Sequence, residues 1–424
     1  MKITHIHIER FRGFQNEDFE VGSLLTAIAG QNGTQKSTLL GIITQTFTLK
    51  TEDSMRVEKP LCGGSYISAF KDKFRLSPTF DKPKGHEWTI SFDAGMDDFT
   101  VESIKRTGDP NVRFWKKGAR QEGDGYISFP TIFLSLKRLV PVAEEAKIIT
   151  DDTLLTQEEL NEFKQLHNKI LIAQTPISSA TTITSKNKQS IGVSTELYDW
   201  NQNSMGQDNL GKIILALFSF KRLHDKYPRQ YKGGILAIDE MDATMYPASQ
   251  VELLKVLRKY ASKLNLQILF TTHSMSLLKA MDDLVQEVTK KEETANQAKI
   301  LYLKKVDDKI AIKQGVNFKG IQLDLNVVAE GNNRKKNRIT AYTEDKENIL
   351  FVKAILKSKA FVLDFVDVTL PCSTLMELVT KRVPAFIYPY STSVFNGILF
   401  FSLIFPHIGS SSGLMFAHSN AIAV

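Results

Sequence analysis

The sequence predicts an α/β fold built on a mixed sheet, with an antiparallel β lobe and a helical lobe attached to it. Three observations lead to this prediction. An apolar strand runs into a glycine-containing loop, and Lys-Ser-Thr then opens a helix, all within residues 24–40. Two further apolar runs, 233–238 and 266–272, have the composition of strands buried on both faces of a parallel sheet. Residues 86–117 alternate apolar and polar side chains between turn residues, which is typical of antiparallel strands.

Length and composition limit the class of protein. The chain has 424 residues, which is enough for two or three domains. Its two cysteines, Cys62 and Cys372, lack metal-ligand spacing, so we expect a cytoplasmic protein without disulfides or a zinc site. No signal peptide precedes the first strand, and the apolar run at 394–405 is too short for a membrane span, so we expect no membrane association. The net charge of +7 permits a nucleic-acid partner but fits a merely soluble surface equally well.

The elements before and after the glycine-containing loop can be predicted in chain order. Residues 1–14 alternate isoleucine with polar side chains, as expected of a strand with one buried face. The antiparallel segment occupies about residues 51–125, and a helical lobe about residues 150–225. This lobe contains a helix that opens on the capping box Thr156-Gln157-Glu158-Glu159. Residues 176–195, rich in Ser, Thr, Lys and Asn, are expected to form a mobile loop.

The glycine-containing loop has the features of a phosphate-binding loop. Backbone N–H groups at a helix N-terminus point at phosphates, and the helix dipole favours negative charge there. Lys36 would reach the β- and γ-phosphates of ATP, and the Ser37 hydroxyl would coordinate Mg²⁺. Gln35 replaces the last glycine of the usual pattern, which leaves two of the three flexible positions. The residues expected to bind ATP here are Gly30, Asn32, Gly33, Thr34, Gln35, Lys36, Ser37 and Thr38.

Two of the later apolar strands end in residues suited to hydrolysis. The first ends in Asp239 and Glu240, and such strand ends line the ligand crevice of a parallel sheet. Asp239 is expected to support the Mg²⁺ shell, and Glu240 to orient and deprotonate the attacking water. The alternative is an ordinary strand followed by an acidic helix start. His273 follows the second strand, where a histidine can contact the γ-phosphate or the water and sense the nucleotide state.

A second anion site is predicted at Ser204-Met205-Gly206-Gln207, a Ser-x-Gly turn that opens an apolar helix. One fold rarely aims two helix N-termini at the same phosphate from opposite sides. A head-to-tail dimer supplies this geometry, with Ser204 and Gly206 of each subunit closing the nucleotide of the other.

The order of these motifs resembles the ABC-type ATPase head shared by SMC, RecF and OLD-family proteins, and Arg10-Phe11-Arg12-Gly13-Phe14 is similar to the start of those heads. The resemblance covers about residues 1–325, and we take the head as residues 1–330. The motifs that it assigns are a Walker A loop at Gly30–Thr38, a signature at Ser204, Gly206 and Gln207, Walker B at Asp239 and Glu240, a D-loop at Met241–Thr244, and a switch histidine at His273. The Q-loop neighbourhood is expected at Phe133–Arg138.

Residues 331–424 resemble a degenerate or truncated Toprim domain, which OLD-family nucleases carry after their ATPase head. Glu344, between a strand and a helix, matches the opening of that domain, or is an exposed helix-start carboxylate. Toprim cleavage also needs an Asp-x-Asp pair for two metal ions, and here Asn396 and Ile398 stand in its place. We therefore expect no nuclease activity. Beyond Arg382 the tail has no charged side chain, so it is either a partner-binding segment or, as we prefer, a truncated end.

Within this group the chain is most similar to PtuA, the ATPase subunit of the Septu anti-phage system, and to its retron-associated relatives, in Gly33–Thr38 and Asn203–Asn209. The resemblance implies an ATP-hydrolysing homodimer or higher homo-oligomer that regulates a separate HNH-type nuclease in bacterial defence. One alternative is an OLD- or Gabija-like ATP-regulated DNA endonuclease. Another is an SMC- or RecF-like DNA-binding scaffold in which ATP holds a dimer together. A transporter ATPase is disfavoured, because the Arg-Phe-Arg-Gly-Phe start has no place there.

Overall fold

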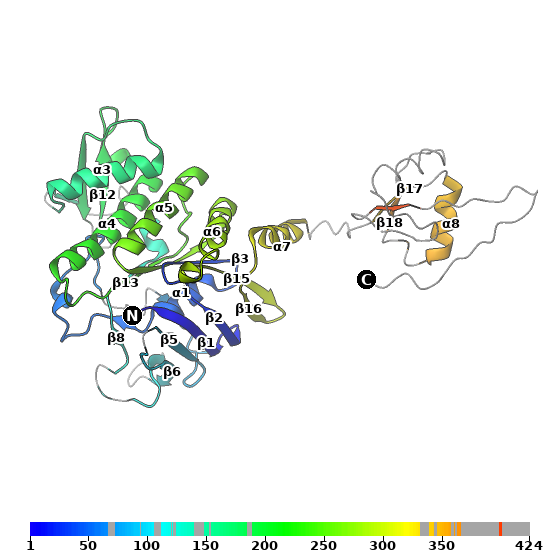
Figure 1. The fold of residues 1–424 in the computed structure, drawn as a ribbon, viewed down its shortest axis with the longest axis horizontal. Coiled ribbons are helices and arrows are strands. Elements are labelled where there is room, and N and C mark those ends of the chain that lie inside the picture. Colours follow the sequence, from blue (N-terminus) through cyan, green and yellow to red (C-terminus); the bar gives the residue numbers. More distant parts are fainter. Residues whose placement is uncertain are drawn as a thin grey trace, which may run out of the picture. The chain divides into compact units, whose positions relative to one another are not determined.

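The chain forms two compact units, Met1–Leu325 and Asn326–Val424, which are described separately (Figure 1). A computed structural model describes residues 1–66, 73–93, 95–105, 112–119, 121, 124–139, 148–151, 154–184, 189–330, 339–342, 346–357, 360, 363–365 and 398–400.

A six-stranded sheet forms the centre of the first unit. Its strands in spatial order are β16 (Lys309–Lys313), β15 (Ala298–Val306), β3 (Leu25–Gly30), β14 (Leu266–Thr272), β13 (Gly234–Ile238) and β9 (Thr131–Leu134). All neighbours pair in parallel except the edge strand β16, which pairs antiparallel with β15. The predicted buried strands at 233–238 and 266–272 are thus confirmed. Because β3, β13 and β14 are parallel, the loops after their carboxyl ends meet at one edge of the sheet.

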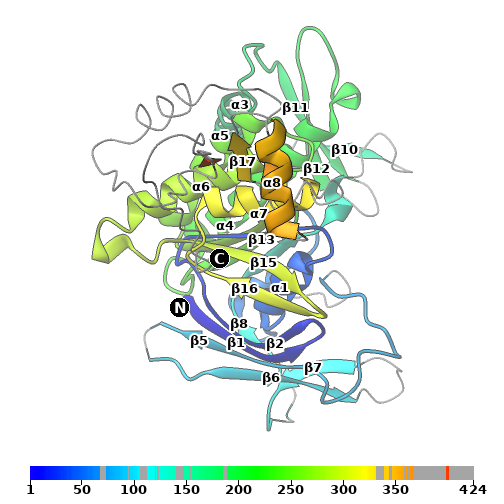
Figure 2. The same ribbon diagram turned by 90° about the vertical axis from the view of Figure 1, so that its right-hand side faces the viewer.

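The central sheet separates two hydrophobic cores, since alternate residues of each strand face opposite sides. Along β13, Leu236 and Ile238 belong to one core, and Ile235 and Ala237 to the other. The first core contains the buried faces of α4 (Met205–Lys226), α5 (Pro247–Lys263) and α6 (Met275–Val288). The second contains α1 (Lys36–Thr44), which lies between the central sheet and the antiparallel strands (Figure 2). Burial on both faces explains why these strands are continuous apolar runs.

The antiparallel lobe is one five-stranded sheet, in the order β2 (Phe14–Glu20), β1 (Ile3–Phe11), β5 (Glu87–Phe92), β6 (Phe99–Lys105) and β7 (Val112–Lys116). Its antiparallel pairing agrees with the alternating pattern of the sequence. The later strands do not form a sheet of their own, however, because β5 pairs with β1. The short strand β4 (Phe47–Thr48), which follows α1, pairs in parallel with β8 (Ile127–Ser128), which precedes β9.

The helical lobe opens as predicted on the capping box at Thr156, which begins α3 (Gln157–Leu171). The prediction of a mobile loop at 176–195 is wrong, because two strands occupy it, β11 (Ser179–Thr184) and β12 (Gln189–Ser194). They form a three-stranded antiparallel sheet with β10 (Ile149–Asp151). The hairpin is held by its few apolar side chains, which are β-branched and buried: Ile183, Ile191 and Val193.

His167 lies in the core of this lobe, with only 2% of its surface exposed and its ring 5.9 Å from that of Phe163. Burial lowers the pKa of His167 from 6.5 to about 4. Between these values the unfolded chain binds a proton that the folded chain does not, so stability falls as the pH falls. We expect lowering the pH from 7 to 5 to cost about 2 kcal/mol through this residue. Urea unfolding of wild type and His167→Leu at both pH values measures the difference, and equal pH dependence in the two proteins would contradict the assignment.

The second unit has a small parallel sheet in the order β18 (Leu363–Phe365), β17 (Ile339–Tyr342) and β19 (Ile398–Phe400). Helix α8 (Lys346–Leu356) follows β17 and packs Val352 near Leu363. Helix α7 (Phe318–Glu330) begins in the first unit and ends in the second. The basic segment 331–338, Glu344 and Asn396 lie outside the described residues. In the described part of the chain, no helix combines the length and apolarity that crossing a bilayer requires.

Candidate nucleotide-binding site

The loop between β3 and α1 has the backbone shape that a phosphate loop requires. Gly33 has a φ of 80°, which favours glycine, and a Cβ on Gly30 would stand 2.4 Å from the carbonyl oxygen of Leu303. The Thr34 hydroxyl donates to the Gln31 carbonyl at 2.8 Å and closes the turn. Among the described residues, no side chain caps the N-terminus of α1. The first N–H groups of α1 are therefore available to a phosphate.

Gln35 occupies the position of the missing glycine and adopts the conformation that a glycine would have. It is the N-cap of α1, with φ 62° and ψ 32°, in the left-handed region. An L-residue pays roughly 1–2 kcal/mol for this conformation. Its buried Oε1 also has no hydrogen-bond partner among the described atoms. The substitution therefore keeps the shape of the loop at a cost in stability.

We expect Gln35→Gly to raise the free energy of unfolding by about 1 kcal/mol, because it removes the left-handed strain and the orphaned acceptor. Urea unfolding without nucleotide measures this gain. Gln35→Ala is the matched control, since alanine removes the acceptor but keeps the strain. If alanine stabilises the protein as much as glycine does, backbone strain is not the cause.

The residues predicted as Walker A and Walker B meet directly. The Ser37 hydroxyl donates to Asp239 Oδ1 at 2.8 Å, and the Thr271 hydroxyl, on β14, donates to the same oxygen at 2.7 Å. Lys36 Nζ donates to the carbonyls of Gly30 and Gln31 at 3.1 and 2.9 Å, so it lies folded over the loop. A hydroxyl and a carboxylate in contact beside a phosphate loop are oxygen ligands of the kind that Mg²⁺ takes. Ser37 and Asp239 therefore fit Mg²⁺.

Glu240 is held through its backbone. Its N–H donates to the Thr271 hydroxyl at 2.6 Å, and its φ of 49° is left-handed. Thr271 thus bridges the two carboxylate residues, a role that sequence reasoning did not assign. Only its place near the end of an apolar strand could have suggested it.

The charged side chains of the site influence one another's pKa values. Burial lowers the pKa of Lys36, and the carboxylates of Glu240, Asp239 and Asp242 oppose that effect. Partial desolvation of the His273 ring and the positive charge of Lys36 lower its pKa below 6.5. His273 is exposed, and its backbone N–H faces Asp242 Oδ1 at 3.4 Å. The lowered pKa favours the uncharged ring, which can either donate a hydrogen bond to a phosphate or accept one from water.

The predicted signature turn is a capped helix start on the surface. Ser204 is the N-cap of α4; its hydroxyl accepts from the Gln207 N–H at 3.3 Å, and the Gln207 side chain accepts from the Ser204 N–H at 2.8 Å. Ser204 and Met205 are exposed, whereas Gly206 is buried. A Cβ on Gly206 would stand 2.5 Å from the Thr244 carbonyl oxygen, so the helix start packs closely on the predicted D-loop.

Arg138 and Asn209 connect these motifs; both end segments named from the sequence, but sequence reasoning assigned no role to either residue. Arg138 lies in the short 3-10 helix Leu136–Leu139 after β9, in the region expected for the Q-loop. Its side chain is 2% exposed and donates to Asn209 Oδ1 at 2.7 Å and to the Glu240 carbonyl at 2.8 Å. Burial lowers its pKa to about 10, with Asp239, Glu240 and Asp242 acting in the opposite direction, so it stays charged at neutral pH.

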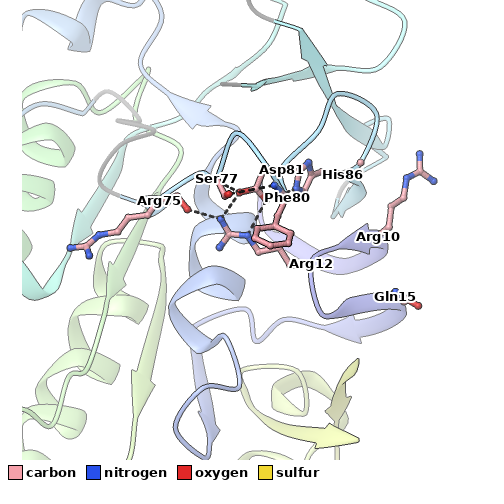
Figure 3. Close-up of a pocket in the computed structure, with 9 residues that line it drawn as sticks. Arg10, Arg12, Gln15, Arg75, Ser77, Phe80, Asp81 and His86 are labelled. Carbon is pink, nitrogen blue, oxygen red and sulfur yellow. Dashed lines mark hydrogen bonds and ion pairs between the residues drawn. The ribbon is translucent and has the colours of Figure 1, made fainter. Parts of the chain in front are cut away.

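A pocket of about 700 Å³ opens at the turn between β1 and β2 (Figure 3). Its polar wall includes Arg10, Arg12 and Arg75, and Phe80 stands in it with 85% of its surface exposed. Arg12 makes a two-pronged ion pair with the buried Asp81, at 3.1 and 3.0 Å. This pair keeps the pKa of Asp81 below its usual value against the effect of burial. Arginine side chains beside the exposed Phe80 ring could bind a nucleotide, with the arginines on its phosphate and the ring stacked on its nucleobase.

The fold and the candidate site are compatible with an ATPase, and comparison with a known family supports this. Residues 135–278, which contain the signature turn, both carboxylates and His273, match the family AAA_15, described as an AAA ATPase domain. The chain is therefore an ATPase and binds ATP. The comparison with curated proteins found no match.

Several solved structures are similar in fold at low sequence identity. The SMC head domain from Thermotoga maritima is 14% identical, covers 74% of this chain and 100% of its own, and has a TM-score of 0.41. An SMC head bound to the C-terminal winged-helix domain of ScpA is 14% identical, with coverage of 76% and 100% and a TM-score of 0.44. The recombination mediator RecF is 12% identical, with coverage of 74% and 98% and a TM-score of 0.38.

Proposed function

We propose that this ATPase closes as a head-to-tail homodimer around two ATP molecules with Mg²⁺, and that closure regulates a separate nuclease. Lys36 and the uncapped start of α1 hold the phosphates, while Ser37 and Asp239 hold the metal ion. Glu240 takes the proton of the attacking water, and His273 contacts the γ-phosphate or that water. Ser204 and Gly206 of the second copy complete the phosphate shell.

One observation carries the dimer. The Ser204 turn is exposed, yet it begins a 22-residue helix whose first turn packs directly on the segment that follows Glu240. A helix start that is open to a partner supplies N–H groups and a positive dipole end for an anion. Ser204 and Met205 are the exposed part of this turn, whereas Gly206 is buried against the Thr244 carbonyl oxygen.

The nuclease partner and the anti-phage role rest on the sequence similarity to the Septu and retron-associated ATPases. No His-Asn-His nuclease pattern is present in the chain, so cleavage would belong to another polypeptide. Purification of the protein from its native operon tests this, followed by nuclease assays over a range of ATP concentrations. We expect a nuclease to copurify and its cleavage to change with ATP. If the protein purifies without a nuclease and infection proceeds equally in a deletion strain, the defence role is wrong.

We also propose that residues 331–424 are a degenerate Toprim-like region. The parallel order β18-β17-β19, with α8 between β17 and β18, is compatible with this assignment. Glu344 and Asn396 are the sequence positions on which it depends. The purified chain should not cut plasmid DNA with Mg²⁺ or Mn²⁺. Cleavage that disappears in Glu344→Ala would instead favour the OLD- or Gabija-like nuclease.

A second candidate function is that of a nucleic-acid-binding scaffold, and the pocket beside the β1–β2 turn favours it. Arg75 and Phe80 there are exposed, and the chain has a net charge of +7. Anisotropy titrations of a labelled single-stranded oligonucleotide at several salt concentrations test this. Salt-sensitive binding that Arg75→Ala and Phe80→Ala weaken, and that Arg229→Ala leaves unchanged, would support it.

A further inference from the structure

Four of the five N–H donors of the Arg138 guanidinium are used, and they hold three elements of the site together. Nη1 donates to the carbonyls of Leu134 and Ser135 at 3.2 and 3.1 Å, which fixes the guanidinium at the end of β9. Nε reaches Asn209 on α4, and Nη2 reaches the Glu240 carbonyl. The planar guanidinium of arginine holds several acceptors at fixed angles, whereas the ammonium group of lysine does not.

Asn209 extends this connection to the predicted D-loop. Its side chain is fully buried: Oδ1 accepts from Arg138, and Nδ2 donates to the Ala243 carbonyl at 3.0 Å. Asn209 lies about one turn into α4, the helix that begins at Ser204. A shift of the start of α4 would therefore displace both the Arg138 guanidinium and the 240–244 segment.

That segment is bounded by two strained residues. Glu240 and Thr244 have φ values of 49° and 68°, which residues other than glycine seldom adopt. Such strained conformations persist only where neighbouring groups hold them in place, and at Glu240 hydrogen bonds do so. The peptide groups on either side of the Glu240 α-carbon are held by Thr271 through the N–H and by Arg138 through the carbonyl.

We propose that Arg138 is a positioning residue of ATP hydrolysis, which with Asn209 couples the Ser204 helix to the backbone of Glu240. The proposal rests on the proposed function, in which Glu240 acts on water and Ser204 meets the partner's nucleotide. When the partner's nucleotide binds at Ser204, the Arg138 guanidinium would fix the orientation of Glu240. ATP hydrolysis would then follow dimer formation. In this proposal Arg138 acts through the Glu240 backbone, whose carbonyl it holds.

Steady-state ATP hydrolysis and binding of a fluorescent ATP analogue by Arg138→Gln and Asn209→Asp test the coupling. Aspartate keeps the acceptor for Arg138 but cannot donate to the Ala243 carbonyl. We expect kcat to fall about 100-fold in Arg138→Gln and about 10-fold in Asn209→Asp, as misplacement of a catalytic group does. The KM and the Kd of the analogue should stay within about threefold of wild type.

Arg222→Gln is the matched control. Arg222 also makes a two-pronged contact, with Glu159 at 2.8 and 2.6 Å, but far along α4 from Ser204, so its loss should lower the melting temperature and leave kcat unchanged. A kcat that is unchanged in both site variants would overturn the proposal, and so would a rise of KM in parallel with lost stability. If Arg138→Gln does not fold, Asn209→Asp alone decides. Lack of hydrolysis by wild type would instead count against the proposed function.

Discussion

Replacing Glu240 by glutamine should lower ATP turnover by at least about 100-fold and leave a stable nucleotide-bound dimer. The amide cannot take a proton from water, and a positioned general base contributes about 10²–10⁴ to the rate. The substitution is nearly isosteric, and the Glu240 backbone is fixed by Thr271 and Arg138, so the site should keep its shape. Because the contacts that bind ATP are untouched, the closed state should accumulate.

Size-exclusion chromatography with light scattering, with ATP and with ADP, measures the dimer, and phosphate release measures turnover. Glu252→Gln on α5 is a suitable control, because it removes one carboxylate whose ion-pair partner is Lys255 on the same helix. A Glu240→Gln protein that remains monomeric with ATP would remove the shared site from the mechanism. Normal turnover would remove Glu240 from the chemistry.

The parts of the site that the sequence predicts are those encoded within a few residues. A strand, a loop and a helix start follow one another at 24–40, and the apolar strand before Asp239 carries its own signal of burial on two faces. Parallel pairing then brings the ends of β3, β13 and β14 to one edge. The apolar pattern of the sequence predicts these parallel strands and therefore which strand ends lie together. For this reason Lys36, Asp239 and His273 could be assigned to one site from the sequence.

The parts that were missed depend on contacts between distant residues. Arg138 meets Asn209 across 71 positions and Glu240 across 102, and nothing near Arg138 in the sequence indicates a buried cation. The strands β11 and β12 were missed for a different reason. Serine and threonine are frequent in both strands, even at buried positions such as Thr182 and Ser190, so the composition is that of a loop, and only a few apolar β-branched residues indicate burial.

Mixing two inactive variants should restore hydrolysis if the sites are shared between copies. Lys36→Met removes the charge that binds phosphate. Ser204→Asp keeps a good N-cap for α4, so the helix stays stable, but its carboxylate repels the γ-phosphate of the facing subunit. Each homodimer has two damaged sites, and each protein alone should lose nearly all turnover.

In a mixed dimer the two defects fall in the same site, and the other site combines an intact Lys36 with an intact Ser204. Random exchange of equal amounts makes half of the dimers mixed, so a quarter of all sites are intact, and turnover should recover to about a quarter of wild type if the sites act independently. Recovery must also depend on total concentration, since it requires exchange of subunits. If Ser204 served the nucleotide of its own subunit, no mixture could rebuild a site, and activity would stay at the level of the separate variants.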